Sequence, residues 1–333
     1  MKSIGVIGAG SWGTSLANLL AKKGHDVVLW AYEGDLVERM RSTHINDLYL
    51  PDVKLSGNLT FSNNLPEVAG RQCLLLVPPS QIMRHLLSQV VDYIRNDAVI
   101  ISASKGIEND TLLPMSDVLK RLLPASLYQR SAYLSGPTFA KEVALGQPSA
   151  VVVAAQDRGI AEQVQDIFNT DYFRVYTNND VVGIELGGAL KNVIALAAGI
   201  CDGLGYGYNT RAALITRGLA EMKRIGIAMG AKGETFAGLA GMGDLVLTCT
   251  GDLSRNRSVG CELGKGRKLT EILADMTMVA EGVKTTLSSY QLAVKLGVEV
   301  PIIDQMYAIL YQDKDPRAAV VELMQRELKS EYI

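Results

Sequence analysis

Short apolar runs alternate with helix-like stretches through the first half of the chain. The runs predict buried strands at residues 4–7, 27–30, 59–61, 73–77, 98–102, 131–134, 149–155 and 173–177. Between them, apolar residues recur every three or four positions, which predicts helices before Gly24 and over 34–40, 82–93, 111–122, 137–143 and 158–168. The polar stretch 42–57, which contains Pro51, predicts a loop. Because runs such as 73–77 are apolar at every position, we expect parallel strands buried on both faces.

The pattern changes near residues 178–180. Strand-like runs stop there, and long helical patterns follow over 181–201, 210–229 and 285–296. A chain of 333 residues is long enough for two domains. We therefore predict an α/β, doubly wound sheet domain over residues 1–179 and an all-helical domain over residues 180–333.

A glycine motif joins the first strand to the first helix. Gly8, Gly10 and Gly13 form the pattern G-x-G-x-x-G. In a strand–turn–helix context, these glycines allow a tight turn, close approach of a pyrophosphate and close helix packing. The N-terminus of the helix then faces the phosphates. The motif predicts a Rossmann-type domain that binds NAD(P), and the alternative is an ordinary glycine-rich turn.

The residues after the second strand bear on the choice of nucleotide. An acid at this place binds the ribose 2′-hydroxyl of NAD, whereas a cation accommodates the 2′-phosphate of NADP. The chain reads Ala31-Tyr32-Glu33 here, and we expect Glu33 to lie too far along, at the start of the next helix. The sequence therefore leaves the choice between NAD and NADP open.

Composition excludes several classes of protein. The net charge of −2 offers no polycationic surface for nucleic acid. The four cysteines form no C-x-x-C pair, so we predict no metal site, no disulfides and a reducing, cytoplasmic location. No run of 18 apolar residues occurs, so we expect no membrane insertion.

Two lysines are candidates for chemistry. Lys105 follows the strand at 98–102, at the sheet edge where open α/β sheets bind ligands, although a solvated loop lysine is the alternative. Lys191 and Asn192 are the strongly polar residues in the middle of a small, apolar helical stretch, 185–199. Burial would lower the pKa of Lys191 and suit it to proton exchange. The alternatives are a lysine that reaches solvent and a buried ion pair.

Other polar residues have plainer interpretations. His25, His44 and His85 all lie in the first half, and we expect them to be structural or solvated. Asp244 follows two glycine positions, and its spacing alone favours a helix cap. Arg255 with Asn256 suits either an anion site or a solvated basic turn.

Six segments together resemble the bacterial NAD(P)-dependent glycerol-3-phosphate dehydrogenases. They are GAGSWGTSLA, SASKGIE, LSGPTFAKEVA, GGALKNVIALAAGI, GMGDLVLTCTGDLSRNR and VAEGV, in the family's order from Gly8 to Val283. The resemblance implies reversible reduction of dihydroxyacetone phosphate to sn-glycerol 3-phosphate by NAD(P)H, for glycerophospholipid synthesis. It also implies a C-terminal domain like that of the 6-phosphogluconate dehydrogenases, a homodimer and no metal.

The resemblance also implies roles for individual residues. Lys191 matches the proton donor and acceptor, Lys105 matches a lysine near the carbonyl, and Asp244 matches a catalytic pocket residue. The implied substrate contacts are Lys105, Gly136, Thr138, Lys191, Asn192, Asp244, Thr248, Ser254, Arg255 and Asn256. The expected cofactor contacts are Gly8, Gly10, Ser11, Trp12, Gly13, Tyr32, Lys105, Ala140, Arg255, Val279 and Glu281. Tyr32 stands where many members carry a basic residue, which argues against a strong NADP preference, and its ring is suited to stacking on adenine.

Two other functions fit the same architecture. The 6-phosphogluconate and β-hydroxyacid dehydrogenases also join a Rossmann domain to a helical domain with a lysine, but the GMGDL and SRNR segments argue against them. A non-catalytic dinucleotide-binding module would bind NAD(P)H without oxidising it.

Overall fold

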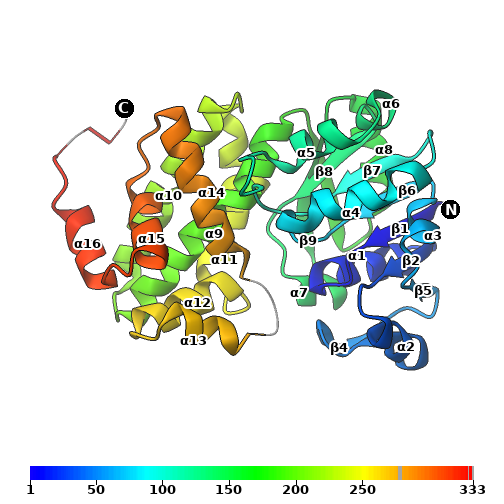
Figure 1. Ribbon diagram of the computed structural model, residues 1–333, viewed down its shortest axis with the longest axis horizontal. Helices are drawn as coiled ribbons and strands as arrows, with labels where there is room; N and C mark the ends of the chain where they lie inside the picture. The colour runs from blue at the N-terminus through cyan, green and yellow to red at the C-terminus, as the bar shows by residue number, and fades with distance from the viewer. Residues whose placement is uncertain (277–279, 329, 332–333) are drawn as a thin grey trace.

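The computed structural model describes residues 1–276, 280–328, 330 and 331. A sheet flanked by helices forms one half of the molecule, and a bundle of helices forms the other (Figure 1). The predicted fold class, a Rossmann-type sheet domain followed by a helical domain, is confirmed.

Eight strands form the sheet in the order β10-β9-β8-β7-β6-β1-β2-β5. They are β1 (Ser3–Ile7), β2 (Asp26–Trp30), β5 (Leu59–Ser62), β6 (Cys73–Leu76), β7 (Val99–Ser102), β8 (Ser131–Ser135), β9 (Ser149–Ala155) and β10 (Phe173–Asn178). In register, Ile7 pairs with both Trp30 and Leu76, so the carboxyl ends of β1, β2 and β6 lie side by side. The chain runs from β1 to β2 and β5 on one side and then crosses to β6 on the other side of β1. Such a switch point is where open α/β sheets bind ligands.

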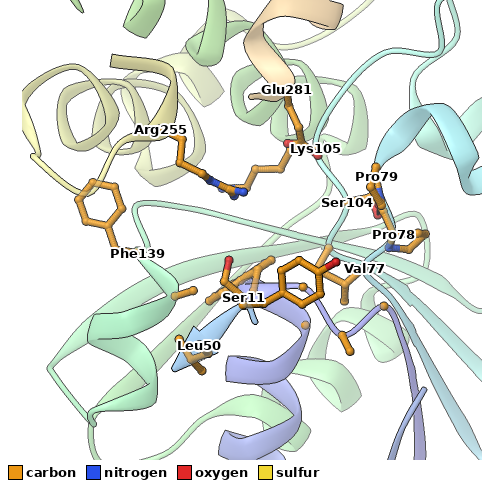
Figure 2. Close-up of a pocket in the computed structure, with 18 of the residues that line it drawn as sticks. Ser11, Leu50, Val77, Pro78, Pro79, Ser104, Lys105, Phe139, Arg255 and Glu281 are labelled. Carbon is orange, nitrogen blue, oxygen red and sulfur yellow. Dashed lines mark hydrogen bonds between the residues drawn. The ribbon is translucent and has the colours of Figure 1, made fainter. Parts of the chain in front are cut away.

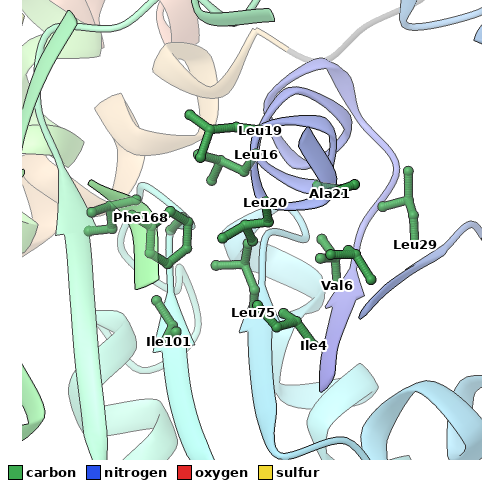
Figure 3. Close-up of a cluster of buried hydrophobic side chains, with 14 of the residues drawn as sticks. Ile4, Val6, Leu16, Leu19, Leu20, Ala21, Leu29, Leu75, Ile101 and Phe168 are labelled. Atoms are coloured by element: carbon green, nitrogen blue, oxygen red, sulfur yellow. The ribbon is translucent and has the colours of Figure 1, made fainter. Parts of the chain in front are cut away.

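Helices cover both faces of the sheet. They are α1 (Ser11–Lys22), α2 (Gly34–Thr43), α3 (Leu65–Ala69), α4 (Met83–Val90), α5 (Met115–Leu122), α6 (Ala125–Tyr128), α7 (Ala140–Ala144) and α8 (Arg158–Phe168). On one face, Leu16 and Leu20 of α1 approach Leu75 of β6 in a continuous apolar core (Figure 3). This packing fixes the N-terminus of α1 above the carboxyl ends of the strands.

Three local predictions were wrong. The stretch 42–57 is not a loop, because β3 (Ile45–Asn46) and β4 (Leu50–Lys54) pair there as a small antiparallel sheet. Pro51 is tolerated because a two-stranded sheet leaves one edge of each strand unpaired. The helices expected at 111 and 137 begin later, at Met115 and Ala140. Strands β8 and β9 pair antiparallel, although the other neighbours in the eight-stranded sheet are parallel.

The helical domain is built around α9 (Val181–Gly203). Its other helices are α10 (Tyr208–Ala228), α11 (Asp244–Thr250), α12 (Arg255–Gly264), α13 (Leu269–Ala274), α14 (Glu281–Leu296), α15 (Pro301–Tyr311) and α16 (Pro316–Met324). By length and composition α9 could cross a membrane, but 89% of its most apolar stretch is buried inside the protein. It is therefore the core helix of this domain.

Glycines let α9 and α12 cross in backbone contact. A Cβ atom on Gly199 would lie 2.0 Å from the carbonyl oxygen of Arg257, and one on Gly260 would lie 2.0 Å from that of Leu196. Larger side chains would force the helices apart. The crossing brings the start of α12, with Arg255, toward the middle of α9.

One buried carboxylate of α10 holds α15 in place. Glu221 is 1% exposed and accepts hydrogen bonds from the backbone N–H groups of Ile302 (2.7 Å) and Ile303 (3.1 Å). Burial raises the pKa of Glu221 to about 7, and the two N–H donors oppose that rise.

We expect Glu221→Ala to lower the free energy of unfolding by about 2 kcal/mol or more, because two buried donors lose their acceptor. Urea unfolding monitored by circular dichroism measures the loss. Glu271→Ala removes an exposed glutamate and serves as the control. Equal stability of the two variants would contradict the role assigned to Glu221.

Candidate active site

A cleft of about 640 Å³ lies between the carboxyl edge of the sheet and the helical domain (Figure 2). Sixteen of the predicted site residues line it: Gly8, Gly10, Ser11, Trp12, Gly13, Tyr32, Lys105, Thr138, Ala140, Lys191, Asn192, Thr248, Ser254, Arg255, Asn256 and Glu281. Gly136 and Asp244 lie behind this lining and contact Lys105. Val279 lies outside the described residues.

The glycine motif forms a tight cradle at the floor of the cleft. Gly8 has φ +116°, a conformation that disfavours any side chain, and a Cβ on Gly13 would lie 1.9 Å from the carbonyl oxygen of Gly8. No atom lies within 4 Å of a Cβ placed on Gly10, so its backbone faces open space. No side chain caps α1 at Gly10, and the indole N–H of Trp12 is buried without a partner among the described residues. These features fit the pyrophosphate of NAD(P).

A buried asparagine holds this cradle from outside. The Asn46 amide, on β3, donates to the carbonyl oxygen of Ala9 (2.8 Å) and to Oγ1 of Thr14 (2.8 Å). Asn46 is fully buried. Sequence analysis missed it because residues 42–57 were predicted to be a loop, and only the pairing of β3 with β4 brings Asn46 under the glycine motif.

The two candidate lysines meet at one carboxylate. Nζ of Lys191 donates to Oδ1 of Asp244 (2.6 Å) and to Oγ1 of Thr248 (2.7 Å). Nζ of Lys105 donates to Oδ2 of Asp244 (2.6 Å) and to the carbonyl oxygen of Gly136 (3.2 Å). An ammonium has three N–H donors, so each lysine keeps one for a ligand.

Asp244 is therefore a shared counterion. It is fully buried at the first position of α11, and the capping position is occupied by Gly243 with no side-chain hydrogen bond. The interpretation of Asp244 as a helix cap is wrong. A π-helical turn at Leu239–Gly243 precedes α11, and its backbone lies close enough to α9 to require a glycine at 187.

The environment of Lys191 favours loss of its proton. The residue is 6% exposed, and burial lowers the pKa of Lys191 to about 8. The charge of Asp244 acts against this shift, and the charge of Lys105 adds to it. A buried amine with a pKa near neutrality is suited to proton transfer in either direction. The interpretation of Lys191 as a lysine that reaches solvent is wrong.

Arg255 supplies a further cation at the cleft. It stands at the first turn of α12, and its guanidinium is directed into the cleft near Lys105 and Glu281 (Figure 2). Burial raises the pKa of Glu281, and the positive charges of Arg255, Lys105 and Lys191 oppose that rise. Arg255 is itself exposed, so its guanidinium is accessible to an anionic ligand, and the predicted anion site stays a prediction.

The neighbours of Arg255 have structural partners of their own. The Ser254 hydroxyl accepts a hydrogen bond from the backbone N–H of Arg257 and so caps α12. The Asn256 amide donates to Oδ1 of Asn192 (3.0 Å), and its oxygen accepts from the N–H of Gly282 (2.9 Å). One N–H of Asn256 is left over. These contacts hold the starts of α12 and α14 beside Lys191.

Phe139 is a lining residue that sequence analysis missed. It precedes α7 in the sheet domain, and a Cβ on Gly251 of the helical domain would lie 2.5 Å from its ring. The ring thus closes one side of the cleft between the two domains. His25, His44 and His85 do not line the cleft.

Comparison with models of protein families identifies the family to which this chain belongs. The N-terminal model of NAD-dependent glycerol-3-phosphate dehydrogenase matches residues 3–161, and the C-terminal model matches residues 180–321. The chain belongs to the NAD-dependent glycerol-3-phosphate dehydrogenase family. It is therefore an oxidoreductase of the class that the six sequence segments suggested.

Full-length relatives agree with this assignment. The chain is 67% identical over 330 residues to glycerol-3-phosphate dehydrogenase [NAD(P)+] of Syntrophotalea carbinolica, covering 99% of each chain. It is 62% identical over 333 residues to that of Citrifermentans bemidjiense, covering 100% of this chain and 99% of the relative. The crystal structure of glycerol-3-phosphate dehydrogenase from Coxiella burnetii superposes with a TM-score of 0.93 at 39% identity, over 98% of this chain and 99% of that one.

Proposed function

We propose that this chain catalyses the reversible reduction of dihydroxyacetone phosphate to sn-glycerol 3-phosphate with NAD(P)H. The observation that carries the proposal is Lys191, a buried amine with a counterion, which opens on the cleft between the glycine cradle and Arg255. Bound NAD(P)H supplies a hydride to C2 of the ketone. Residues 1–179 would then bind the nucleotide, and residues 180–333 would bind the substrate.

The chain's own residues then handle charge and protons. Lys191 donates a proton to the carbonyl oxygen as the hydride arrives, and Asp244 orients the ammonium for that transfer. Lys105 adds a second positive charge beside the developing alkoxide, which lowers the energy of the transition state. In the oxidative direction the neutral amine of Lys191 removes the hydroxyl proton.

Binding would divide between two groups of residues. The nucleotide would contact Gly8, Gly10, Ser11, Trp12, Gly13, Tyr32, Lys105, Ala140, Arg255 and Glu281. The substrate would contact Lys105, Gly136, Thr138, Lys191, Asn192, Asp244, Thr248, Ser254, Arg255 and Asn256. Arg255 suits the phosphate because a guanidinium matches its oxygens in a two-pronged contact. We further propose a cytoplasmic homodimer that supplies glycerophospholipid synthesis.

A spectrophotometric assay tests the proposal. Purified protein is mixed with dihydroxyacetone phosphate and either NADH or NADPH, and absorbance at the reduced nicotinamide band is followed. We expect nucleotide oxidation that depends on dihydroxyacetone phosphate. Absence of oxidation with both nucleotides, in protein that binds one of them, would instead support a non-catalytic binding module. Faster turnover of 6-phosphogluconate with the oxidised nucleotides would support the other dehydrogenase class.

Arg255→Ala tests the phosphate contact. We expect KM for dihydroxyacetone phosphate to rise about tenfold to a hundredfold, because a charge-assisted hydrogen bond contributes about 1.5–3 kcal/mol. Activity with phosphate-free dihydroxyacetone should change far less. Arg255→Lys, which keeps the charge without the two-pronged geometry, should recover part of the loss. Equal losses with the two ketones would show that Arg255 does not bind the phosphate.

A further inference from the structure

The turn between β2 and α2 carries a carboxylate, in the part of a Rossmann domain that binds the adenosine half of a dinucleotide. Glu33 follows Gly13 by 20 residues, and it lines the cleft together with Trp30 and Tyr32. In Rossmann domains an acid about 20 residues beyond the motif binds the ribose 2′-hydroxyl. As expected, Glu33 lies at the start of the next helix, where it occupies the capping position of α2, and it still lines the cleft.

A tyrosine from the second small sheet holds this carboxylate. The hydroxyl of Tyr49, between β3 and β4, donates to Oε1 of Glu33 at 2.9 Å, and Tyr49 also lines the cleft. Burial and the hydrogen bond to Glu33 raise the pKa of Tyr49, so it remains a donor. The second oxygen of Glu33 is thus left to accept a ligand hydroxyl.

The nearby cations of α2 are already neutralised. Arg39 donates to Asp47 (2.8 Å) and Asp35 (2.6 Å). Arg41 donates to Glu38 (2.7 Å) and to the carbonyl oxygen of Phe61.

The cations that line the cleft, within the described ranges, are also engaged or distant from β2. Lys141 is paired with Asp52 at 2.6 Å. Lys105 and Lys191 share Asp244, and Arg255 points at the cleft from the helical domain. A 2′-phosphate beside Glu33 would therefore meet a negative charge without a free cation to offset it.

We propose that Glu33, held by Tyr49, makes this enzyme select NADH over NADPH. The carboxylate accepts a hydrogen bond from the 2′-hydroxyl of NADH and repels the 2′-phosphate of NADPH. This inference rests on the proposed function for its physiological meaning, but it concerns nucleotide binding alone and is tested without turnover.

Intrinsic fluorescence provides the test. Trp12 and Trp30 are the two tryptophans of the chain, and both line the cleft, so NADH or NADPH should quench them on binding. We expect the wild-type protein to bind NADH at least about tenfold more tightly than NADPH. Glu33→Gln keeps an acceptor for Tyr49 and removes the charge, so it should tighten NADPH binding at least about fivefold.

Glu162→Gln is the matched control, because it removes an exposed carboxylate of α8 outside the cleft lining. It should retain the wild-type ratio of dissociation constants. Equal wild-type affinities, or an unchanged ratio in Glu33→Gln, would overturn the proposal. If the wild-type protein binds NADH and NADPH equally well and oxidises both with dihydroxyacetone phosphate, the specificity proposal fails and the proposed function stands. Selective NADH binding without any oxidation would show the reverse.

Discussion

We expect Lys191→Met to lower kcat for dihydroxyacetone phosphate reduction by about a thousandfold. General acid catalysis typically contributes a factor of about 10² to 10⁴, and methionine keeps the length of the side chain without its proton. In this variant the buried carboxylate of Asp244 still pairs with Lys105, so it is not left without a cation. Steady-state kinetics with saturating nucleotide measure the loss.

Two controls make this prediction specific. Tryptophan quenching by NADH should be unchanged in Lys191→Met, because the lysine acts on the ketone and not on the nucleotide. Lys295→Met, at an exposed position of α14, should keep wild-type kcat. Turnover within a few-fold of wild type in Lys191→Met would remove the lysine from the mechanism.

The second prediction with a large effect concerns Asp244, the carboxylate that Lys105 and Lys191 share. In Asp244→Asn, two ammonium groups lose the carboxylate that bridges them in a fully buried position. Removing an anion disfavours the charged form of a neighbouring amine, so the pKa of Lys191 should fall below its value of about 8. At pH 8 less of the lysine would carry a proton, and its orientation would be lost. We expect kcat for reduction to fall on the order of a hundredfold.

Stability should change with activity in this variant. Breaking a buried ion pair by removing one partner costs about 3–5 kcal/mol, so Asp244→Asn should unfold at lower urea concentration. Asp275→Asn, which removes an exposed carboxylate paired with Arg267, should change neither property. If Asp244→Asn keeps full activity at pH 8, Asp244 is not the group that sets the charge on Lys191.

Local sequence pattern was sufficient for the parts of the site that depend on neighbouring residues. The strand, glycine motif and helix at the start of the chain predicted the cradle, because all its residues lie within one supersecondary unit. The apolar surroundings of Lys191 likewise predicted a buried amine. The structure confirms that burial.

Contacts between distant residues could not be predicted in this way. Asp244 is 53 residues from Lys191 in the chain, and its own spacing favoured a helix cap. The contact of Asn46 with the glycine motif and that of Tyr49 with Glu33 depend on the fold of β3 and β4, where proline and polar residues predicted a loop. Only the resemblance to a known family pointed to Asp244 as part of the site.

The pH dependence of kcat/KM in both directions tests the role of Lys191 most directly, because it reports groups that titrate in the free enzyme. With a pKa of about 8, the protonated amine needed for reduction is lost as pH rises through that value, and the neutral amine needed for oxidation appears. We therefore expect kcat/KM for dihydroxyacetone phosphate to fall above about pH 8 and kcat/KM for sn-glycerol 3-phosphate to rise to a plateau there. Profiles that are flat from about pH 7 to 9.5, or that persist unchanged in Lys191→Met, would contradict proton transfer by this lysine.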